Sequence, residues 1–212
     1  MTDRPIIFSA TMVRALLDGS KTQTRRLVKP QPGDIDRVFQ MDDGSWHVTA
    51  HDGSHMSALR IPYAPGDRLW VREAWAKVSV APIVATIDAP WTVYRACDNR
   101  TDYGGPWKPS IHMARNQSRL TLIVEGVKVE RLQDISREDA IAEGLTLASA
   151  QIEQFWRWPE PLHENLWLSP KIAYADLWRT IHGPGAWDAN PWVAAISFRV
   201  VKSNIDAIAE AA

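Results

Sequence analysis

Several side chains that could do chemistry together lie in the segment 19–26, which reads Gly-Ser-Lys-Thr-Gln-Thr-Arg-Arg. The amine of Lys21 stands three positions before the hydroxyl of Thr24, and the guanidinium groups of Arg25 and Arg26 follow. A lysine can take a proton from a hydroxyl only in the fraction of molecules in which its amine is neutral. Burial or a second cation nearby increases this fraction by lowering the pKa of the lysine. Either arginine could be that cation. The alternative is that these cations only complement the dipole at the end of a preceding helix.

Glu143 is the carboxylate that we expect to act on this lysine. The residues from Ser136 to Asp139 have the pattern of a capping box, so a short helix should begin there and end at Gly144. Glu143 then lies in the last turn, where the helix dipole opposes its charge by roughly 0.3 to 1 kcal/mol. The functional interpretation is that this carboxylate orients the lysine, as the third member of a catalytic triad does. The alternative is an exposed glutamate for which that cost is small.

The elements that would position these residues can be located from the sequence. Ser9 can cap a helix with an apolar face, and Gly19 is placed to end that helix just before the lysine. Alternating apolar residues predict strands over 68–72, 120–129 and 192–201, and a shift of the alternation at Gly126 predicts a bulge. A further helix should carry Tyr174 and Trp178. The segment 31–58 has the composition of turns and a hairpin.

Length and composition limit the class of protein. The 212 residues suit a single domain, 1–212, with insertions near 31–60, 76–108 and 149–190. The 24 Lys and Arg nearly balance the 25 Asp and Glu, which argues against a general nucleic-acid coat. The single cysteine, Cys97, excludes an intrachain disulfide and fits a reducing, cytoplasmic setting. No apolar run is long enough to span a bilayer, so no membrane partner is expected.

Further residues are candidates for the wall of a substrate pocket, because a pyrimidine needs a flat apolar face and a few fixed polar groups. These candidates are Trp70, Glu73, Trp75, Ser110 and His112. The competing interpretations are that the tryptophans pack in the core, that the glutamate forms a surface salt bridge and that the histidine is structural. His47, His51 and His55 recur every four residues, but the intervening Asp-Gly-Ser argues against a helix and therefore against a metal site.

A family resemblance follows from these motifs. The run from Gly19 to Arg26 resembles the Gly-x-Lys-x-x-x-x-Arg motif of ASCH domains, a PUA-like superfamily associated with RNA. The segments Gly-Asp-Arg-Leu-Trp-Val-Arg-Glu-Ala-Trp and Pro-Ser-Ile-His-Met are similar to those of longer ASCH proteins of phages and prophages. The resemblance implies an α+β fold, a mostly antiparallel β-barrel with short flanking helices and inserted loops.

The chain also resembles small ASCH amidohydrolases that remove the acyl group from N4-acetylcytidine with a Lys, Thr and Glu triad. That resemblance implies Lys21, Thr24 and Glu143 as catalytic residues, the last in its Ala-Glu-Gly-Leu-Thr-Leu context, with no cofactor and no metal. Thr24 would attack the acyl carbonyl, or a water activated by Lys21 or Glu143 would do so. Arg26 would bind the substrate, where it or a backbone amide stabilises the oxyanion. The partner implied is a modified cytidine. An RNA-binding or modified-base-reading module, or a ribonuclease using the same site, is the alternative.

Overall fold

The computed structural model describes residues 1–32, 35–50, 56–78, 91–97, 106–149, 155–158 and 166–210. The helices are α1 (Ala10–Asp18), α2 (Arg137–Ala142), α3 (Pro170–His182) and α4 (Ile205–Glu210), with short 3-10 turns at Ser110–His112, Arg115–Gln117 and Leu132–Asp134. The strands are β1 (Asp3–Ile7), β2 (Gln23–Leu27), β3 (Ile35–Gln40), β4 (Trp46–Ala50), β5 (Met56–Leu59), β6 (Arg68–Arg72), β7 (Trp75–Val78), β8 (Trp91–Tyr94), β9 (Thr121–Arg131), β10 (Thr146–Ser149), β11 (Phe155–Arg157) and β12 (Trp192–Val201).

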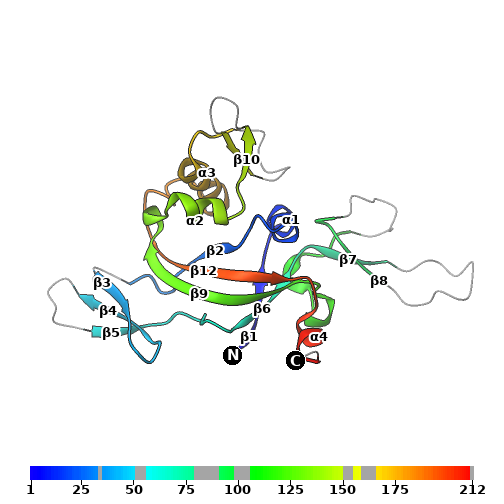
Figure 1. Ribbon diagram of the computed structural model, residues 1–212, viewed down its shortest axis with the longest axis horizontal. Coiled ribbons are helices and arrows are strands. Elements are labelled where there is room, and N and C mark those ends of the chain that lie inside the picture. The colour runs from blue at the N-terminus through cyan, green and yellow to red at the C-terminus, as the bar shows by residue number, and fades with distance from the viewer. Residues whose placement is uncertain are drawn as a thin grey trace, which may run out of the picture.

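A five-stranded sheet in the order β1-β6-β9-β12-β2 is the centre of the molecule (Figure 1). Its neighbouring strands are antiparallel except β1 and β6, which run parallel. The predicted α+β class with mostly antiparallel strands is therefore confirmed. Hydrogen bonding among the described strands leaves this sheet open, with β1 and β2 as its edges. Arg26 on one edge nevertheless donates from Nη2 to the carbonyl of Ile7 on the other at 2.8 Å, so the sheet is curled.

The helix that precedes the lysine forms where the sequence predicts it. Ser9 accepts a hydrogen bond from the backbone N–H of Met12, and Gly19 ends α1 with a left-handed φ of +84°. Val13 and Leu16 are fully buried in the main core, so the apolar face of α1 lies against the sheet. Burial of each such side chain contributes about 1.5–3 kcal/mol and fixes the point at which the chain leaves the helix.

The predicted bulge at Gly126 is also present. Ser197 on β12 lies opposite Gly126, but the next residue, Phe198, lies opposite Val124, so Glu125 is the extra residue on β9. A bulge bends its strand and increases the local twist. β9 consequently curves along its length beside β12, as Figure 1 shows.

Two parts of the structure differ from the sequence predictions. Residues Gln23–Leu27, taken as a segment after the helix, form edge strand β2, which pairs with β12. The segment 31–58 contributes a three-stranded antiparallel sheet, β3-β4-β5, in place of a simple hairpin, with residues 33, 34 and 51–55 outside the described residues. This small sheet has its own cluster of buried residues around Val48 and Leu59.

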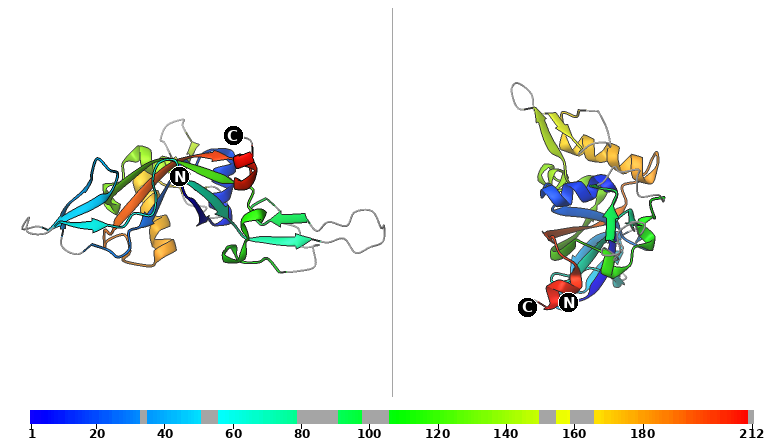
Figure 2. Two further views of the ribbon diagram at one scale, coloured as in Figure 1. Left: turned by 90° about the horizontal axis from the view of Figure 1, so that it is seen from below. Right: turned by 90° about the vertical axis from the view of Figure 1, so that its right-hand side faces the viewer.

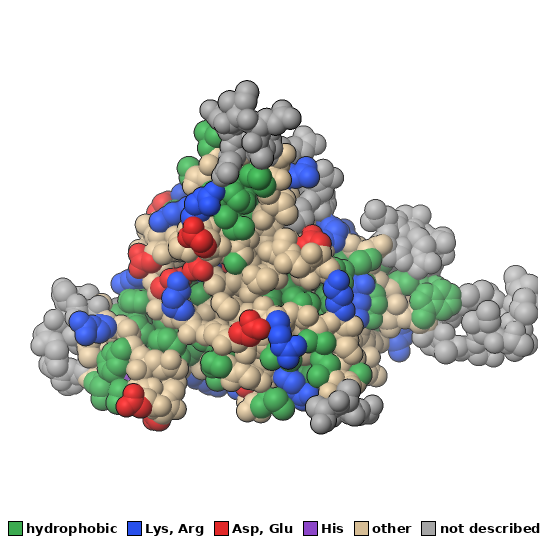
Figure 3. All heavy atoms as spheres, in the orientation of Figure 1, with side chains coloured by type: hydrophobic (Ala, Val, Ile, Leu, Met, Phe, Trp, Pro, Cys, Tyr) green, Lys and Arg blue, Asp and Glu red, His purple; other side chains and the backbone are tan. Residues whose placement is uncertain are grey.

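Helices α1, α2 and α3 lie on one side of the central sheet, and the β3–β5 sheet and the β7–β8 pair extend at its two ends (Figures 1 and 2). No helix in the described ranges is both long and apolar enough to cross a bilayer. Acidic and basic side chains are interspersed on the face drawn in Figure 3, as the near-zero net charge leads one to expect. The side of the sheet that the helices cover is where the candidate site forms.

Candidate functional site

Lys21 and Glu143, which are 122 positions apart in the sequence, meet in the interior of the molecule. The Lys21 Nζ lies 2.6 Å from Glu143 Oε2 and 2.8 Å from the Glu143 carbonyl oxygen. The two residues also form an antiparallel β-bridge, so their backbones are in register. Only 1% of Lys21 and 3% of Glu143 is exposed. An ion pair this deep in the molecule has lost its hydration, which makes the exact placement of both groups energetically important.

Helix α2 places Glu143 at this position. Ser136 begins the helix by accepting a hydrogen bond from the backbone N–H of Asp139 at 3.0 Å, which is half of the predicted capping box. Glu143 caps the other end, and Gly144 leaves the helix with a left-handed φ of +111°. The lysine ammonium binds both the carboxylate and the carbonyl of Glu143 and so offsets the unfavourable helix dipole there.

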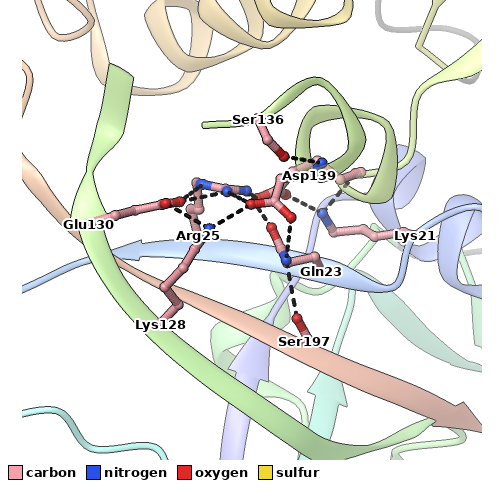
Figure 4. Close-up of polar contacts among 9 residues, drawn as sticks. Lys21, Gln23, Arg25, Lys128, Glu130, Ser136, Asp139 and Ser197 are labelled. Atoms are coloured by element: carbon pink, nitrogen blue, oxygen red, sulfur yellow. Dashed lines mark hydrogen bonds and ion pairs between the residues drawn. The ribbon is translucent and has the colours of Figure 1, made fainter. Parts of the chain in front are cut away.

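Arg25, whose contacts with Glu130 and Asp139 are drawn in Figure 4, also holds the second oxygen of the Glu143 carboxylate. Its Nη1 donates to Glu143 Oε1 at 3.2 Å, while Nη2 lies 2.7 Å from Glu130 and 2.9 Å from Asp139. None of the Arg25 side chain is exposed. Gln23 adds a bond to Arg25 and one to Asp139. With one oxygen on Lys21 and the other on Arg25, the Glu143 carboxylate has a fixed orientation.

The electrostatic surroundings lower the pKa of Lys21. Burial is the largest cause, the Glu143 carboxylate opposes it, and the positive charges of Arg26 and Arg25 add to the lowering. Both conditions that the sequence suggested for a deprotonated lysine are therefore present. Tyr174 packs nearby, and burial together with the Glu143 charge raises its pKa well above the ordinary value, so it stays a neutral phenol at neutral pH.

A pocket of about 330 Å³ opens beside this pair. Its wall consists of Ile7, Phe8, Ser9, Met12, Lys21, Thr24, Arg25, Arg26, Glu143, Tyr174, Leu177, Trp178, Ile181 and His182. Thr24, which is 4% exposed and lies on β2, thus borders the same cavity as the lysine and the glutamate. Helix α3 supplies the opposite wall, in which Trp178 and His182 lie with ring centroids 4.2 Å apart.

The other predicted pocket residues lie elsewhere. Glu73 is buried and forms two hydrogen bonds to Arg119, and burial raises its pKa despite that partner. Trp75 is buried on β7, and Trp70 on β6 lies beneath the Arg72 guanidinium. The Ser110–His112 turn contributes Ser110 to a separate pocket near Cys97 and exposes His112. The structure therefore brings Arg26 together with the three catalytic candidates, but not these five residues.

The spaced histidines do not form a helix face. His47 lies on β4 and its Nε2 is 3.0 Å from the Ser45 hydroxyl, whereas His51 and His55 lie outside the described residues. Over the described ranges, no group of three or more His, Cys, Asp and Glu side chains could hold a metal ion.

The sequence does not indicate that two acidic residues and one tyrosine contribute to the site. Glu130 lies just beyond the predicted strand 120–129, and Asp139 is predicted only as part of a capping box, yet both bind Arg25. Tyr174 was read as the apolar face of a helix. The usable signal is charge: Glu130 continues a strand with apolar Val127 and Val129, and a carboxylate that becomes buried there needs a cation.

Comparisons with protein-family models, with curated proteins and with solved structures found no match. Function is therefore inferred from the chemistry that the Lys21, Thr24 and Glu143 side chains allow in this pocket.

Proposed function

We propose that this protein is an amidohydrolase that removes the acyl group from N4-acylated cytosine nucleosides, with N4-acetylcytidine as the reference substrate. The observation that carries this proposal is the buried Lys21–Glu143 pair beside Thr24 in one pocket. A hydroxyl nucleophile, an amine with a lowered pKa and an orienting carboxylate are the three parts that acyl transfer requires.

In the first step the Thr24 hydroxyl oxygen attacks the acyl carbonyl carbon and Lys21 accepts the hydroxyl proton. The carbonyl oxygen becomes an oxyanion, which Arg26 or a backbone N–H stabilises. The C–N bond then breaks, Lys21 returns the proton to the leaving N4 nitrogen, and cytidine departs. The acyl group remains as an ester on Thr24. Glu143 keeps the lysine amine directed at the reacting atoms throughout.

In the second step a water replaces the nucleoside. Lys21 takes a proton from this water, the resulting hydroxide attacks the ester carbonyl, and Thr24 leaves with the proton returned by the lysine. The products are cytidine and the carboxylic acid. Direct attack by a water that Lys21 or Glu143 activates uses the same residues and gives the same products, without the ester.

The pocket walls suit an acylated pyrimidine. Phe8 from the end of β1 and Trp178 from α3 offer flat apolar surfaces, and Tyr174 adds a neutral phenol. Planar rings bind well between such surfaces because ring stacking and the burial of apolar surface both contribute to the affinity. The polar groups are gathered on the β2 side, where the exocyclic amide would need to lie.

A non-catalytic RNA-binding role fits the same residues less well. It requires the cations of this segment to contact phosphates. Lys21 and Arg25 are buried and bound to carboxylates, so a phosphate could reach them only by breaking these ion pairs. Arg26 alone among the three cations is accessible enough for such a contact.

We also propose that the fold is PUA-like and that the chain is an ASCH protein with a reducing, cytoplasmic setting. In support, the curled five-stranded sheet has its two edges joined through Arg26, and the lysine motif follows helix α1. The exposed Cys97 is a free thiol.

The test is incubation of the protein with N4-acetylcytidine while ultraviolet absorbance and product chromatography are followed. The expected result is equimolar cytidine and acetate, retained in Thr24→Ser and reduced about 100-fold or more in Thr24→Val, which keeps the shape but not the hydroxyl. A folded protein that releases no cytidine would refute the proposal for this substrate. Equal rates in both Thr24 variants would exclude the ester intermediate on Thr24 and would support direct attack by an activated water.

A further inference from the structure

A second pocket adjoins the Lys21 pocket on the far side of Arg26. It encloses about 310 Å³ between the end of β2 and the segment that joins β5 to β6. Three cationic side chains line it, those of Arg26, Lys29 and Arg60, together with the phenol of Tyr63. No acidic residue is among its lining residues in the described part of the chain.

Lys29 and Arg60 are not neutralised by nearby acids, whereas the Glu143 carboxylate of the neighbouring pocket acts on the charge of Arg26. Within the described ranges, neither Lys29 nor Arg60 forms an ion pair, and both side chains are exposed. Arg26 donates one hydrogen bond, to the carbonyl of Ile7, and its Nε has no partner there. Arg119 and Arg68, by contrast, are each matched to a carboxylate. Three like charges around one hollow repel each other unless an anion enters it.

The two pockets are adjacent and electrostatically coupled. Arg26 lines both of them. His182, on the rim of the Lys21 pocket, has its pKa lowered first by burial and then by the charges of Arg26 and Lys29. Lys29 therefore lies close enough to act on a group in the first pocket. A ligand seated against the lysine and glutamate would extend past Arg26 toward Lys29 and Arg60.

We propose that the pocket of Arg26, Lys29 and Arg60 binds a phosphate group of the substrate whose acylated base occupies the Lys21 pocket. This inference rests on the proposed function, and it makes the substrate a nucleotide in place of a free nucleoside. Arginine and lysine side chains in a concave site are the usual partners of phosphate, and arginine can bind it with two parallel hydrogen bonds. The phosphate is that of a free nucleotide or of a nucleotide within a chain.

The test compares the binding of cytidine, cytidine 5′-monophosphate and the dinucleotide CpC by titration calorimetry at low salt. The native protein should bind at least one phosphate-bearing probe about tenfold more tightly than cytidine, since a charge-assisted hydrogen bond is worth about that factor. The double variant Lys29→Ala/Arg60→Ala should bind all three probes alike. Preference for the monophosphate would assign a terminal phosphate, and preference for CpC alone would assign an internal one.

The matched control is Lys77→Ala/Arg157→Ala, which also removes one lysine and one arginine. Both side chains are exposed on strands and line neither pocket. This control should keep the native preference. Equal affinity of the native protein for all three probes would overturn the phosphate site, as would a preference that survives in Lys29→Ala/Arg60→Ala.

Binding does not require turnover, so the two proposals fail separately. A protein that prefers phosphate-bearing probes through Lys29 and Arg60 but leaves both N4-acetylcytidine and N4-acetylcytidine 5′-monophosphate intact would refute the amidohydrolase alone. A protein that deacylates N4-acetylcytidine but binds the three probes alike would refute the phosphate site alone.

Discussion

Burial of Lys21 links the stability of the protein to pH at the scale of one residue. Its pKa in the folded protein lies below the ordinary value of 10.5, and the unfolded chain has the ordinary value. Between these two values the unfolded chain binds more protons than the native protein, so the free energy of unfolding rises with pH in that window. The effect ends above 10.5, where both states are neutral.

We therefore expect the native protein to gain stability relative to Lys21→Met as pH rises toward 10.5. Methionine is an unbranched side chain only one atom shorter than lysine, and it does not titrate. Urea unfolding of both proteins at a series of alkaline pH values measures the difference. Parallel stability curves for the two proteins would contradict a lowered pKa.

Arg25 should be essential to the fold around the site. Arg25→Gln would leave the carboxylates of Glu130, Asp139 and Glu143 without their shared cation, so a loss of about 3–5 kcal/mol is expected from urea unfolding. Arg179→Gln, which breaks the solvent-exposed pair with Asp188, is the control and should cost less than about 1 kcal/mol. Similar losses in both variants would show that the buried network contributes little.

At the scale of elements, the end of α2 must pack closely against the lysine. A Cβ at Gly144 would lie 3.1 Å from the Ala15 Cβ and 3.3 Å from the Lys21 Cβ. Gly144→Ala should therefore destabilise by about 1–3 kcal/mol more than Gly185→Ala and should lower kcat, because it displaces Glu143. Gly185 also has a positive φ, of +81°, but nothing stands within 4 Å of its added Cβ.

Thermal unfolding and N4-acetylcytidine turnover of the two glycine variants make this comparison. If Gly185→Ala destabilised as much and lowered kcat as much, the close approach of α2 to Lys21 would not be what positions the glutamate.

The elements with clear apolar periodicity were predictable, and those held by side-chain networks were not. The α1 helix buries helically spaced apolar residues, β6 buries alternating ones, and β12 alternates apolar with polar residues from Ile196 to Val200, so their patterns identify them. Strand β2 reads Gln-Thr-Arg-Arg-Leu, and only its pairing with β12 and the carboxylates around Arg25 make it a strand. The contribution of α3 to the pocket depends on tertiary packing, which periodicity does not specify.

The candidate site shows the same division. Lys21 and Thr24 are only three positions apart in the sequence, and the predicted end of a helix at Gly144 indicated the position of Glu143. The partners of Arg25 come from β9 and α2, so no local pattern connects them. Glu73 and Trp75 come shortly after β6, but neither reaches the pocket. Glu73 forms a buried ion pair with Arg119, and Trp75 packs in the core.

At the scale of the whole molecule, the described residues form two separate clusters of buried side chains, which predicts two levels of stability. The small cluster of Val28, Val48, Leu59 and Trp192 joins the β3–β5 sheet to the rest, while Leu122 belongs to the main core. We expect Val48→Ala to speed hydrogen exchange of amides in β3–β5 only. Leu122→Ala should lower the global free energy of unfolding by about 2–5 kcal/mol. Exchange that accelerates equally in β9 and β12 after Val48→Ala would show one cooperative unit.

The central claim is that Lys21 is the base for deacylation in this pocket. Its most direct test is the initial rate of N4-acetylcytidine loss with Lys21→Met beside Lys77→Met, an exposed lysine on β7, at equal concentrations of folded protein. The expected result is a native rate for Lys77→Met and a rate lowered about 100-fold or more for Lys21→Met. Equal rates for the two variants would contradict the claim.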